Sequence, residues 1–459
     1  MSLPVDIKND VLRLTKEGGI KQIRFLYCDN GGIIRGKSVG WQSLADRING
    51  GVGLTVAMQA MNGLDELVPI QGVGAAGEVR LTPDLRTFKI LPYSPRAAMM
   101  ICDMLELDGQ PWELCPRSFL RRIVEQGRGE FGLTILAAFE PEWSLARRGL
   151  DGSYTAIDDS LCFSTIGMTT QAAMIDELLG AFEAQNLKVE LYHPELAHGQ
   201  QELSISPARA LEAADNHIIY RETVRSVAWN HGLFASFAPK PFINQAGNGN
   251  HVHISAWTGD QGDQNLFYDP SDPYSLSQTG YYFIGGILEH LPALVALTCP
   301  SVNSYRRLQP KAWSSAYTCY GFDNREAAVR IASTLRGKES SSINLEIKAS
   351  DNTNNPYLAL GGIIAAGLDG VRRKLHPGEK LRAEVDPATI PEEERLERGI
   401  KALPTSLGQA LDNLEKDEVL LNALGGKLAK TYIAVRRSEE KSYAARTTDF
   451  ELNSHFYKY

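Results

Sequence analysis

The segment 20–41 constrains the fold more strongly than any other part of the sequence. It contains two runs of strand-forming residues on either side of Asp29-Asn30-Gly31-Gly32, which has strong turn-forming chemistry. These runs predict a β-hairpin. Further strand-like runs at 77–81, 88–91 and 97–105 predict a small β-rich N-terminal domain, which we expect to end at the connector Asp108-Gly109-Gln110-Pro111.

After Pro116 the pattern changes to a longer alternation of helix and strand. Ser206-Pro207 and Gly232 frame one predicted helix, since proline is favoured at the start of a helix and glycine just after its end. With 459 residues the chain is long enough for two domains, and we expect an α+β fold with domains at 1–108 and 109–459. The pattern predicts a strand at 136–145 and helices at 117–126, 170–186, 207–231, 281–297 and 356–373.

The charge and composition disfavour several classes of function. A formal net charge of -8 disfavours binding to nucleic acid or to an anionic membrane, because both need a basic surface. The first ten residues, MSLPVDIKND, do not resemble a signal peptide, and we see no apolar run near the length of a membrane span. The 6 cysteines form no CxxC pair and predict free thiols. We therefore expect a cytoplasmic protein that acts on small molecules, with no nucleic-acid or membrane partner.

Two glycine-rich matches to phosphate-binding patterns have the wrong context. The run GGIIRGKS at 31–38 fits the P-loop pattern, but it begins in the hairpin turn and continues along the predicted return strand. The run GVGAAG at 72–77 fits a dinucleotide-binding pattern, but it precedes a predicted strand. Both patterns need a strand before them and a helix N-terminus after them, so we predict that neither binds a nucleotide.

Glu140 and Glu142 lie two positions apart in the predicted strand 136–145. Successive side chains of a strand point to opposite faces, so these two carboxylates share a face and could share a metal ion. The pair is weak evidence alone, because a chain with 55 acidic residues contains several such pairs, most of them solvated strand faces.

Further groups of polar residues follow along the chain. Their carboxylates and imidazoles, without a set of thiolates, favour Mg²⁺ or Mn²⁺ over structural zinc, and arginines in the same region would bind phosphate or carboxylate. Singly, each of these residues is more often an ordinary surface or core residue. Together they are the components of phosphoryl transfer. The groups are His193-Pro194-Glu195, Gly199 to Glu202, Gly247 to Ser255 with His251 and His253, the arginines 306, 307, 325 and 330, and Glu346 with Lys348.

These groups, in this order, resemble the motifs of the glutamine synthetase superfamily. Any one motif is weak, but the ordered set is specific and spans nearly the whole chain. The resemblance implies an N-terminal β-grasp domain and a C-terminal catalytic domain with a curved antiparallel sheet flanked by helices. The motifs are E-P-E at 140–142, H-x-E with G-Q-x-E at 193–202, G-x-G-x-H-x-H-x-S at 247–255, N-S-Y-x-R-L at 303–308, N-R with a later R at 324–330, and E-x-K before N-P-Y-L at 346–358.

The resemblance also implies roles for individual residues. One metal ion would be held by Glu142, Glu195 and Glu202, and a second by Glu140, His251 and Glu346. The nucleotide site would contain His253, Ser255 and Arg330, with Arg325 at the transferred phosphate. The amino-acid substrate would contact Gly247, Arg307, Glu142 and His251, with Lys348 where the family usually has an arginine; Arg325, Arg307 and the flap residue Trp313 would act in catalysis.

The implied reaction uses ATP, Mg²⁺ or Mn²⁺, glutamate and an amine. The γ-carboxylate of glutamate attacks the γ-phosphate of ATP to give a γ-glutamyl phosphate, and an amine then displaces phosphate. Family members form stacked rings in which neighbouring subunits share active sites, so the resemblance implies a ring-shaped homo-oligomer, a dodecamer in the family.

The chain departs from the family at the site where the acceptor amine binds. Glutamine synthetases carry an Asp in the N-terminal domain and a Glu in a flap after N-S-Y-x-R, and both attract ammonium. The segment 53–60 contains no acid, and Trp313 stands at the flap position. Since Met58 and Trp313 add apolar surface, we predict an organic amine as acceptor, the alternative being that Trp313 only packs the flap.

Other departures concern the glutamate side and the branch of the family. Asn344 and Lys348 replace arginines, which leaves the identity of the carboxylate substrate open. Gln309-Pro310, Trp313 and Glu346-Ile347-Lys348 are similar to FluG-type domains and to γ-glutamyl-amide synthetases. No tyrosine occurs at 380–395, so we predict no adenylylation. Two alternatives stay open: an ammonia-using glutamine synthetase, and a non-catalytic scaffold or sensor, which the six ligand-competent metal positions disfavour.

Overall fold

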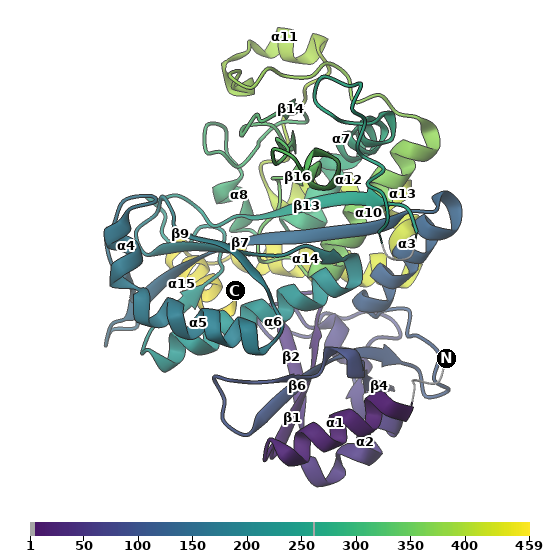
Figure 1. Ribbon diagram of the computed structural model, residues 1–459, viewed down its shortest axis with the longest axis vertical. Coiled ribbons are helices and arrows are strands. Elements are labelled where there is room, and N and C mark those ends of the chain that lie inside the picture. The colour runs from purple at the N-terminus through teal and green to yellow at the C-terminus, as the bar shows by residue number, and fades with distance from the viewer. Residues whose placement is uncertain (1–4, 260–261) are drawn as a thin grey trace.

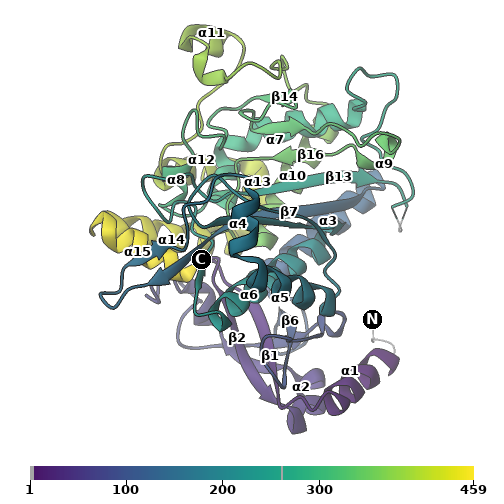
Figure 2. The ribbon, with the colours of Figure 1, turned by 60° about the vertical axis from the view of Figure 1, so that its left-hand side comes forward.

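The computed structural model describes residues 5–259 and 262–459 (Figure 1). The first four residues of the N-terminal segment considered above therefore lie outside the described residues. The polypeptide forms two sheets with helices packed on them, and Figure 2 shows the smaller N-terminal sheet below the larger one. The α+β class predicted from the sequence is confirmed.

The N-terminal part is a 6-stranded mixed sheet with strand order β2-β1-β6-β4-β3, in which β5 pairs with β6. The antiparallel pairing of β1 with β2 confirms the predicted hairpin, and β1 runs parallel to β6. The run 31–38 crosses the hairpin turn into β2, and the run 72–77 leads into β4, so neither match precedes a helix. The elements are α1 (Val5–Glu17), β1 (Gln22–Cys28), β2 (Ile34–Gly40), α2 (Leu44–Gly50), β3 (Val52–Thr55), β4 (Glu78–Pro83), β5 (Lys89–Ile90) and β6 (Ala97–Leu105).

The larger part is built on a 10-stranded sheet with the order β14-β15-β16-β13-β7-β10-β9, in which β8, β11 and β12 also pair with β7. All of these pairs are antiparallel except β14 with β15. β7 is the longest strand and the axis of the sheet. The strands are β7 (Thr134–Arg148), β8 (Tyr154–Ala156), β9 (Val189–Pro194), β10 (Gln200–Ile205), β11 (Ala208–Arg209), β12 (Phe234–Ser236), β13 (Asn250–Trp257), β14 (Tyr320–Phe322), β15 (Val329–Ile331) and β16 (Leu345–Ile347).

Helices cover this sheet and form about half of the C-terminal third of the chain. The helix predicted at 207–231 begins later, at Ala210, because Ala208 and Arg209 pair with β7 as β11. The segment 170–186 forms the end of one helix and the whole of the next. The helices are α3 (Pro116–Phe131), α4 (Thr165–Thr170), α5 (Ala172–Ala184), α6 (Ala210–Asn230), α7 (Gln278–Thr298), α8 (Ser304–Arg307), α9 (Glu339–Ser342), α10 (Pro356–Arg373), α11 (Glu392–Glu397), α12 (Leu407–Leu414), α13 (Glu418–Leu424), α14 (Gly426–Ala444) and α15 (Thr448–Lys458).

The core helices α7 and α10 cross at very short range. A Cβ at Gly286 would lie 2.1 Å from the Ala366 carbonyl oxygen, and one at Gly370 would lie 2.1 Å from the Tyr282 carbonyl oxygen, so only glycine fits at either position. Among the described residues, one helix, α7, is long and apolar enough (mean hydropathy 1.3) to cross a membrane by these two criteria, which we did not predict. The window is 72% buried inside the fold, as is usual for a core helix of a soluble protein.

His290 of α7 connects α7 to α10 through the buried carboxylate of Asp369, and to the N-terminus of α13 through the half-buried carboxylate of Asp417. Its Nδ1 lies 2.7 Å from Asp417 Oδ2, and its Nε2 lies 3.1 Å from Asp369 Oδ2. Burial alone would lower the pKa of His290, but the two hydrogen-bonded carboxylates outweigh it and raise the pKa above 6.5. The imidazolium can donate to both partners at once, whereas the neutral ring can donate to only one.

We therefore expect the contribution of His290 to stability to depend on pH. Because the pKa is higher in the folded than in the unfolded state, the contribution is complete below pH about 6.5 and is lost as the pH rises through the folded-state pKa. The free energy of unfolding, measured in urea from acidic to alkaline pH, should differ most between wild type and His290→Gln at the acidic end. His376→Gln, at an exposed histidine, is the control. A difference that does not change with pH would contradict this assignment.

The hairpin turn of the N-terminal sheet packs against the loop that precedes α10. Asn355 Nδ2 donates to the carbonyl oxygens of Cys28 and Asp29, at 3.1 and 3.0 Å. A Cβ at Gly32 would lie 2.1 Å from the Thr353 carbonyl oxygen, so this turn requires glycine. The N-terminal sheet thereby braces a loop that continues into the candidate site.

Candidate active site

One face of the large sheet collects the polar residues that the sequence singled out. In β7, Glu140 and Glu142 alternate with Phe139, Pro141 and Trp143, which point to the opposite, buried face. The predicted strand periodicity is therefore confirmed, and the two carboxylates share a face.

The pairing register brings distant residues beside these carboxylates. His251 of β13 lies opposite Glu140, and His253 lies opposite Glu346 of β16. On the other side of β7, Glu202 of β10 lies opposite Glu142. The structure thus places most of the predicted metal ligands on adjacent strands of a single surface.

Glu346 lies at the centre of the inner group and is only 1% exposed. Its Oε1 is 3.1 Å from His251 Nδ1 and 3.7 Å from Lys348 Nζ, and its Oε2 accepts from Arg330 Nε. Arg307 Nη2 lies 3.3 Å from His251 Nε2, which leaves His251 as a neutral ring between a carboxylate and a guanidinium. Burial and the charge of Lys348 lower the pKa of His251 accordingly.

His253 is held differently from its neighbour. Its Nε2 is 3.1 Å from Glu140 Oε2, and its Nδ1 is 2.7 Å from Asn344 Oδ1. Burial alone would lower the pKa of His253, but the carboxylate of Glu140 outweighs it and raises this pKa to about 9. Asn344, at a position where the family usually has an arginine, therefore orients His253.

The structure groups the inner ligands slightly differently from the resemblance. Ligand atoms of Glu140, His253 and Glu346 lie within 4.8 Å of one another, so His253 joins the compact group in place of His251. His251 still contacts Glu346 and stays a predicted ligand. Two carboxylates and an imidazole at this spacing can hold a divalent cation.

A second compact group, separate from the first, contains His193, Glu195 and Glu202. Burial and the carboxylates of Glu142 and Glu140 raise the pKa of Glu202 to about 10, and burial raises the pKa of Glu195. Carboxylates that repel one another in this way fit a divalent cation, which would neutralise them. His193 was not among the predicted ligands. What brings His193 to this group is its position opposite Glu202 in the β9–β10 pairing. The sequence alone does not show that pairing.

Two groups that were not predicted orient Glu142. Its Oε2 accepts hydrogen bonds from Gln200 Nε2 at 2.8 Å and from the Gly249 backbone N–H at 2.9 Å. A Cβ on Gly249 would lie 2.6 Å from Arg307 Nη2 and 3.0 Å from His251 Nε2. Gly249 is therefore the point where the backbone must approach the site closely. The glycine-rich motif at 247–255 indicated such an approach but not which glycine makes it.

The predicted amino-acid residues lie beside the inner group. Arg307 Nη1 donates to the Ser350 carbonyl oxygen at 3.1 Å, and a Cβ on Gly247 would lie 2.9 Å from Arg307 Cγ. Lys348 is 3% exposed; burial lowers its pKa, although Glu346 opposes the effect. A buried lysine and a fixed guanidinium in one corner provide a receptor for a carboxylate.

The residues predicted to bind the nucleotide and its phosphates are spread more widely than the predicted metal ligands. Ser255 lies on the same face of β13 as His253, and its Oγ accepts from Trp257 Nε1. Arg330 is paired with Glu346. Arg325 is exposed, and its charge acts on Glu195 in the second compact group.

Trp313 lies in the flap, which we define as residues 309–315. Its side chain is 57% exposed, and its backbone has φ of 52°, with Lys311 at 61° and Ser315 at 66°. Three non-glycine residues in the left-handed region are costly, so contacts outside the flap must hold this conformation. The exposure of the indole disfavours the alternative that Trp313 only packs the flap of its own chain.

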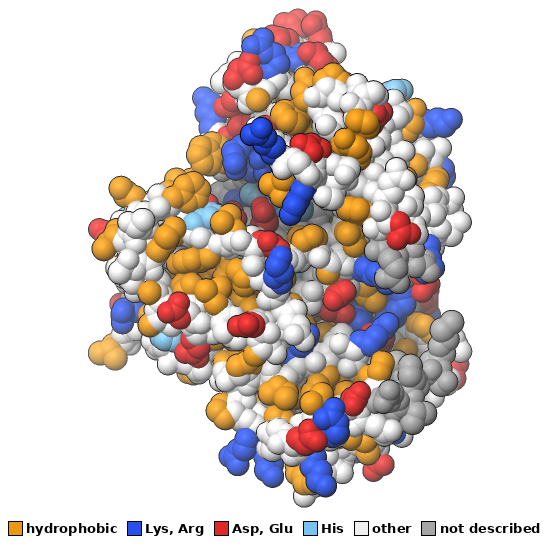
Figure 3. Space-filling model, in the orientation of Figure 1, with side chains coloured by type: hydrophobic (Ala, Val, Ile, Leu, Met, Phe, Trp, Pro, Cys, Tyr) orange, Lys and Arg blue, Asp and Glu red, His pale blue; other side chains and the backbone are white. Residues whose placement is uncertain are grey.

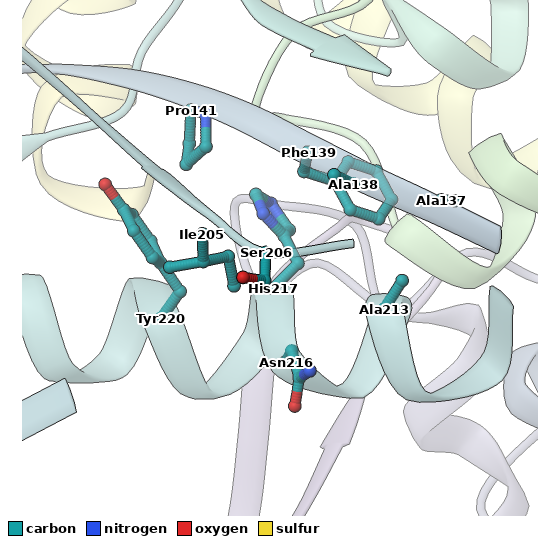
Figure 4. Close-up of a pocket in the computed structure, with 10 residues that line it drawn as sticks. All are labelled: Ala137, Ala138, Phe139, Pro141, Ile205, Ser206, Ala213, Asn216, His217 and Tyr220. Carbon is teal, nitrogen blue, oxygen red and sulfur yellow. The ribbon is translucent and has the colours of Figure 1, made fainter. Parts of the chain in front are cut away.

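The site is an open trough rather than an enclosed cavity. In Figure 3, acidic, basic and histidine side chains meet in the recess at the centre of the visible face. A small pocket lies on the opposite face of β7, between β7 and α6, but its volume of about 10 Å³ has room for no more than one water molecule and excludes a substrate. Figure 4 shows its lining, which is Ala137, Ala138, Phe139, Pro141, Ile205, Ser206, Ala213, Asn216, His217 and Tyr220.

Comparisons with known proteins agree with this arrangement. The glutamine synthetase N-terminal domain matches residues 9–112, and the glutamine synthetase catalytic domain matches residues 113–455. The γ-glutamylpolyamine synthetase GlnA3 of Streptomyces coelicolor is 36% identical over 445 residues, covering 96% of this chain and 94% of the relative. A glutamine synthetase of Methanocaldococcus jannaschii is 36% identical over 384 residues, covering 82% and 83%.

Solved structures show the same fold over almost the full length. A novel glutamine synthase homolog superposes with a TM-score of 0.83 at 34% identity, covering 95% of this chain and 98% of the other. An ADP complex of GmaS superposes with a TM-score of 0.83 at 30% identity, covering 96% and 98%. The chain therefore belongs to the glutamine synthetase family of ATP-dependent, metal-using ligases.

Proposed function

We propose that this ligase joins an organic amine to the γ-carboxylate of glutamate and forms a γ-glutamyl amide. The observation that carries the proposal is the exposed indole of Trp313 in a flap without an acidic residue. The name of one similar protein supports it in part, because that protein is a γ-glutamylpolyamine synthetase. An equally identical relative is a glutamine synthetase, so ammonia is the second candidate acceptor.

The residues of the trough divide the reaction between them. Arg307, Lys348 and the glycine-lined corner at Gly247 would orient the glutamate so that its γ-carboxylate oxygen attacks the γ-phosphorus of ATP. Arg325 and Arg330 would bind the phosphates. ADP leaves, and an amine that binds as a cation gives up one proton so that its nitrogen has a free lone pair. The nitrogen then attacks the activated acyl carbon, and phosphate departs as the nitrogen loses a second proton to form the neutral amide.

The two compact groups would hold the divalent ions that the family requires, which we propose are Mg²⁺ or Mn²⁺. When bound, such ions neutralise phosphate charge and polarise the transferred phosphoryl group. The ligands would be the predicted Glu140, Glu142, Glu195, Glu202, His251 and Glu346, with His193 and His253 beside them.

We also propose a ring-shaped homo-oligomer in which a neighbouring subunit completes the trough. The open trough supports this, because one chain leaves it uncovered. In the family, the N-terminal domain of a neighbouring subunit completes the site, and here that domain would bring the segment Val56–Ala60. Met58 would then face the site of the next subunit. Light scattering or native mass spectrometry gives the subunit number.

The test of the proposed function is phosphate release from ATP and glutamate with a panel of acceptors. Ammonium, methylamine, isopropylamine, ethanolamine, putrescine and aniline sample charge, size and shape. A higher kcat/KM for an organic amine supports the proposal. Preference for ammonium assigns the chain to glutamine synthesis, and ATP binding without turnover on any acceptor supports a scaffold or sensor.

Trp313→Ala should lower kcat/KM for the preferred organic amine about tenfold, since one wall of its subsite is lost. The effect on ammonium should be smaller, because a small cation makes little contact with an indole. Trp229→Ala removes another exposed tryptophan and is the matched control. Equal losses for ammonium and the organic amine would mean that Trp313 serves the flap and not the acceptor.

A further inference from the structure

Glu326 lies directly beneath the flap, next to Arg325. Its Oε1 accepts a hydrogen bond from the Trp313 backbone N–H at 3.2 Å. The adjacent Ala327 carbonyl oxygen accepts from Ser315 Oγ at 2.8 Å. The segment 326–327 is therefore one of the contacts that hold the left-handed backbone of the flap.

The position of Glu326 is rigid. Asn324 is 1% exposed, and its Oδ1 accepts from the backbone N–H groups of Glu326 and Ala327, at 2.9 and 3.1 Å. Its Nδ2 donates to the carbonyl oxygens of Arg382 and Val385, each at 2.8 Å. These four hydrogen bonds fix the backbone of Glu326 through contacts that do not involve the flap.

The flap reaches the glutamate corner from its other end. Ser314 Oγ donates to the Arg307 carbonyl oxygen at 2.8 Å. Neighbouring flap residues therefore hydrogen-bond to Glu326 and to the backbone of Arg307, and the charge of Lys348 acts on Glu326. Burial raises the pKa of Glu326, while its hydrogen bond with the flap lowers it. The carboxylate is half-buried, which strengthens its interaction with a nearby cation.

A primary alkylamine is a cation at neutral pH, as the lysine side chain is. A site for it needs a negative charge, yet neither the flap nor the segment 53–60 contains an acid, and Lys311 adds a positive charge to the flap. Among the described residues whose side chains hydrogen-bond to the flap backbone, Glu326 is the one that carries a carboxylate. We infer that Glu326 is the anionic group of the amine subsite, where it binds the protonated acceptor beside the indole of Trp313. This inference rests on the proposed function.

The substitution Glu326→Gln tests the negative charge of Glu326 separately from its hydrogen bond to the flap. Its amide oxygen can still accept from the Trp313 N–H, but the negative charge is lost. We expect KM for the preferred cationic amine to rise about 10-fold to 100-fold, the range for a hydrogen bond to a charged group. KM for ATP and for glutamate should not change, and Glu326→Asp should restore part of the amine affinity. Asp151→Asn is the matched control, because Asp151 also accepts a backbone N–H, in the exposed turn between β7 and β8.

Hydroxylamine, which is uncharged at neutral pH, distinguishes charge from structure. Its kcat/KM should be equal in wild type and Glu326→Gln. Equal losses for hydroxylamine and the cationic amine would show that Glu326 only supports the flap, and an unchanged amine KM would show that it does not bind the amine; either overturns the inference. Preference of the wild type for ammonium would overturn the proposed function alone, because ammonium is itself a cation and its KM still reports on Glu326.

Discussion

Replacing Glu346 with alanine should lower kcat about 10³-fold, since the loss of several kcal/mol of charge stabilisation corresponds to at least that factor. Glu346 is the central carboxylate of the inner group and contacts His251, Arg330 and Lys348. Without it, two cationic groups and a histidine lose their shared partner, and the predicted metal site loses a ligand. We expect a large loss with every acceptor of the panel, because the substitution affects phosphoryl transfer, which comes before the amine reacts.

Metal affinity should fall with activity. Titration of Mn²⁺ binding by electron paramagnetic resonance reports the affinity without turnover, and unfolding in urea shows whether the variant is folded. Glu397→Ala, in the exposed helix α11, is the matched control. If the Glu346→Ala protein binds Mn²⁺ as tightly as wild type does, Glu346 is not a metal ligand, whatever the activity of the variant.

Replacing Gly249 with alanine should lower kcat/KM about 10²-fold, because displacement of catalytic groups by about 1 Å costs that much. The added methyl group would lie 2.6 Å from Arg307 Nη2, 3.0 Å from Glu142 Oε1 and 3.0 Å from His251 Nε2. All three side chains would have to shift at once. The change adds one carbon and no charge, so its effect measures how tightly the trough is packed.

Stability should be nearly unaffected by Gly249→Ala, since the clash is with the ends of side chains and not with backbone. Gly180→Ala is the control: the site lies in α5, and a Cβ there meets nothing within 4 Å. That substitution should leave activity unchanged and stabilise the helix by about 0.5–1 kcal/mol. Wild-type activity in Gly249→Ala would show that the three side chains can separate without cost.

The local structure of the chain followed largely from local signals. The hairpin formed because Asp29-Asn30-Gly31-Gly32 is a turn sequence in which Gly32 adopts a positive φ that other residues avoid. The shared face of Glu140 and Glu142 followed from the two-residue period of a strand. The predicted start of α6 was wrong because a tertiary contact, the pairing of β11 with β7, competes with the helix signal at Pro207.

The composition of the site followed from the sequence only through the ordered motifs. These named most of the side chains that the sheet gathers, but not their partners. That His253 approaches Glu140, that His193 joins Glu195 and Glu202, and that Glu326 holds the flap were all unforeseen. Each of these contacts joins segments that are distant along the chain or separated by a loop.

The sequence by itself determined the hairpin, several of the strands and helices, the shared face of Glu140 and Glu142, and the kinds of group available for chemistry. Only the tertiary structure decided which groups meet. The register between β7, β13 and β16 depends on the packing of the sheet, with α3 and α6 against β7, because no local pattern links residue 140 to residues 253 and 346. The same holds for the flap, whose left-handed residues are stable only because Glu326 and Ala327, on another loop, bind its backbone and side chains.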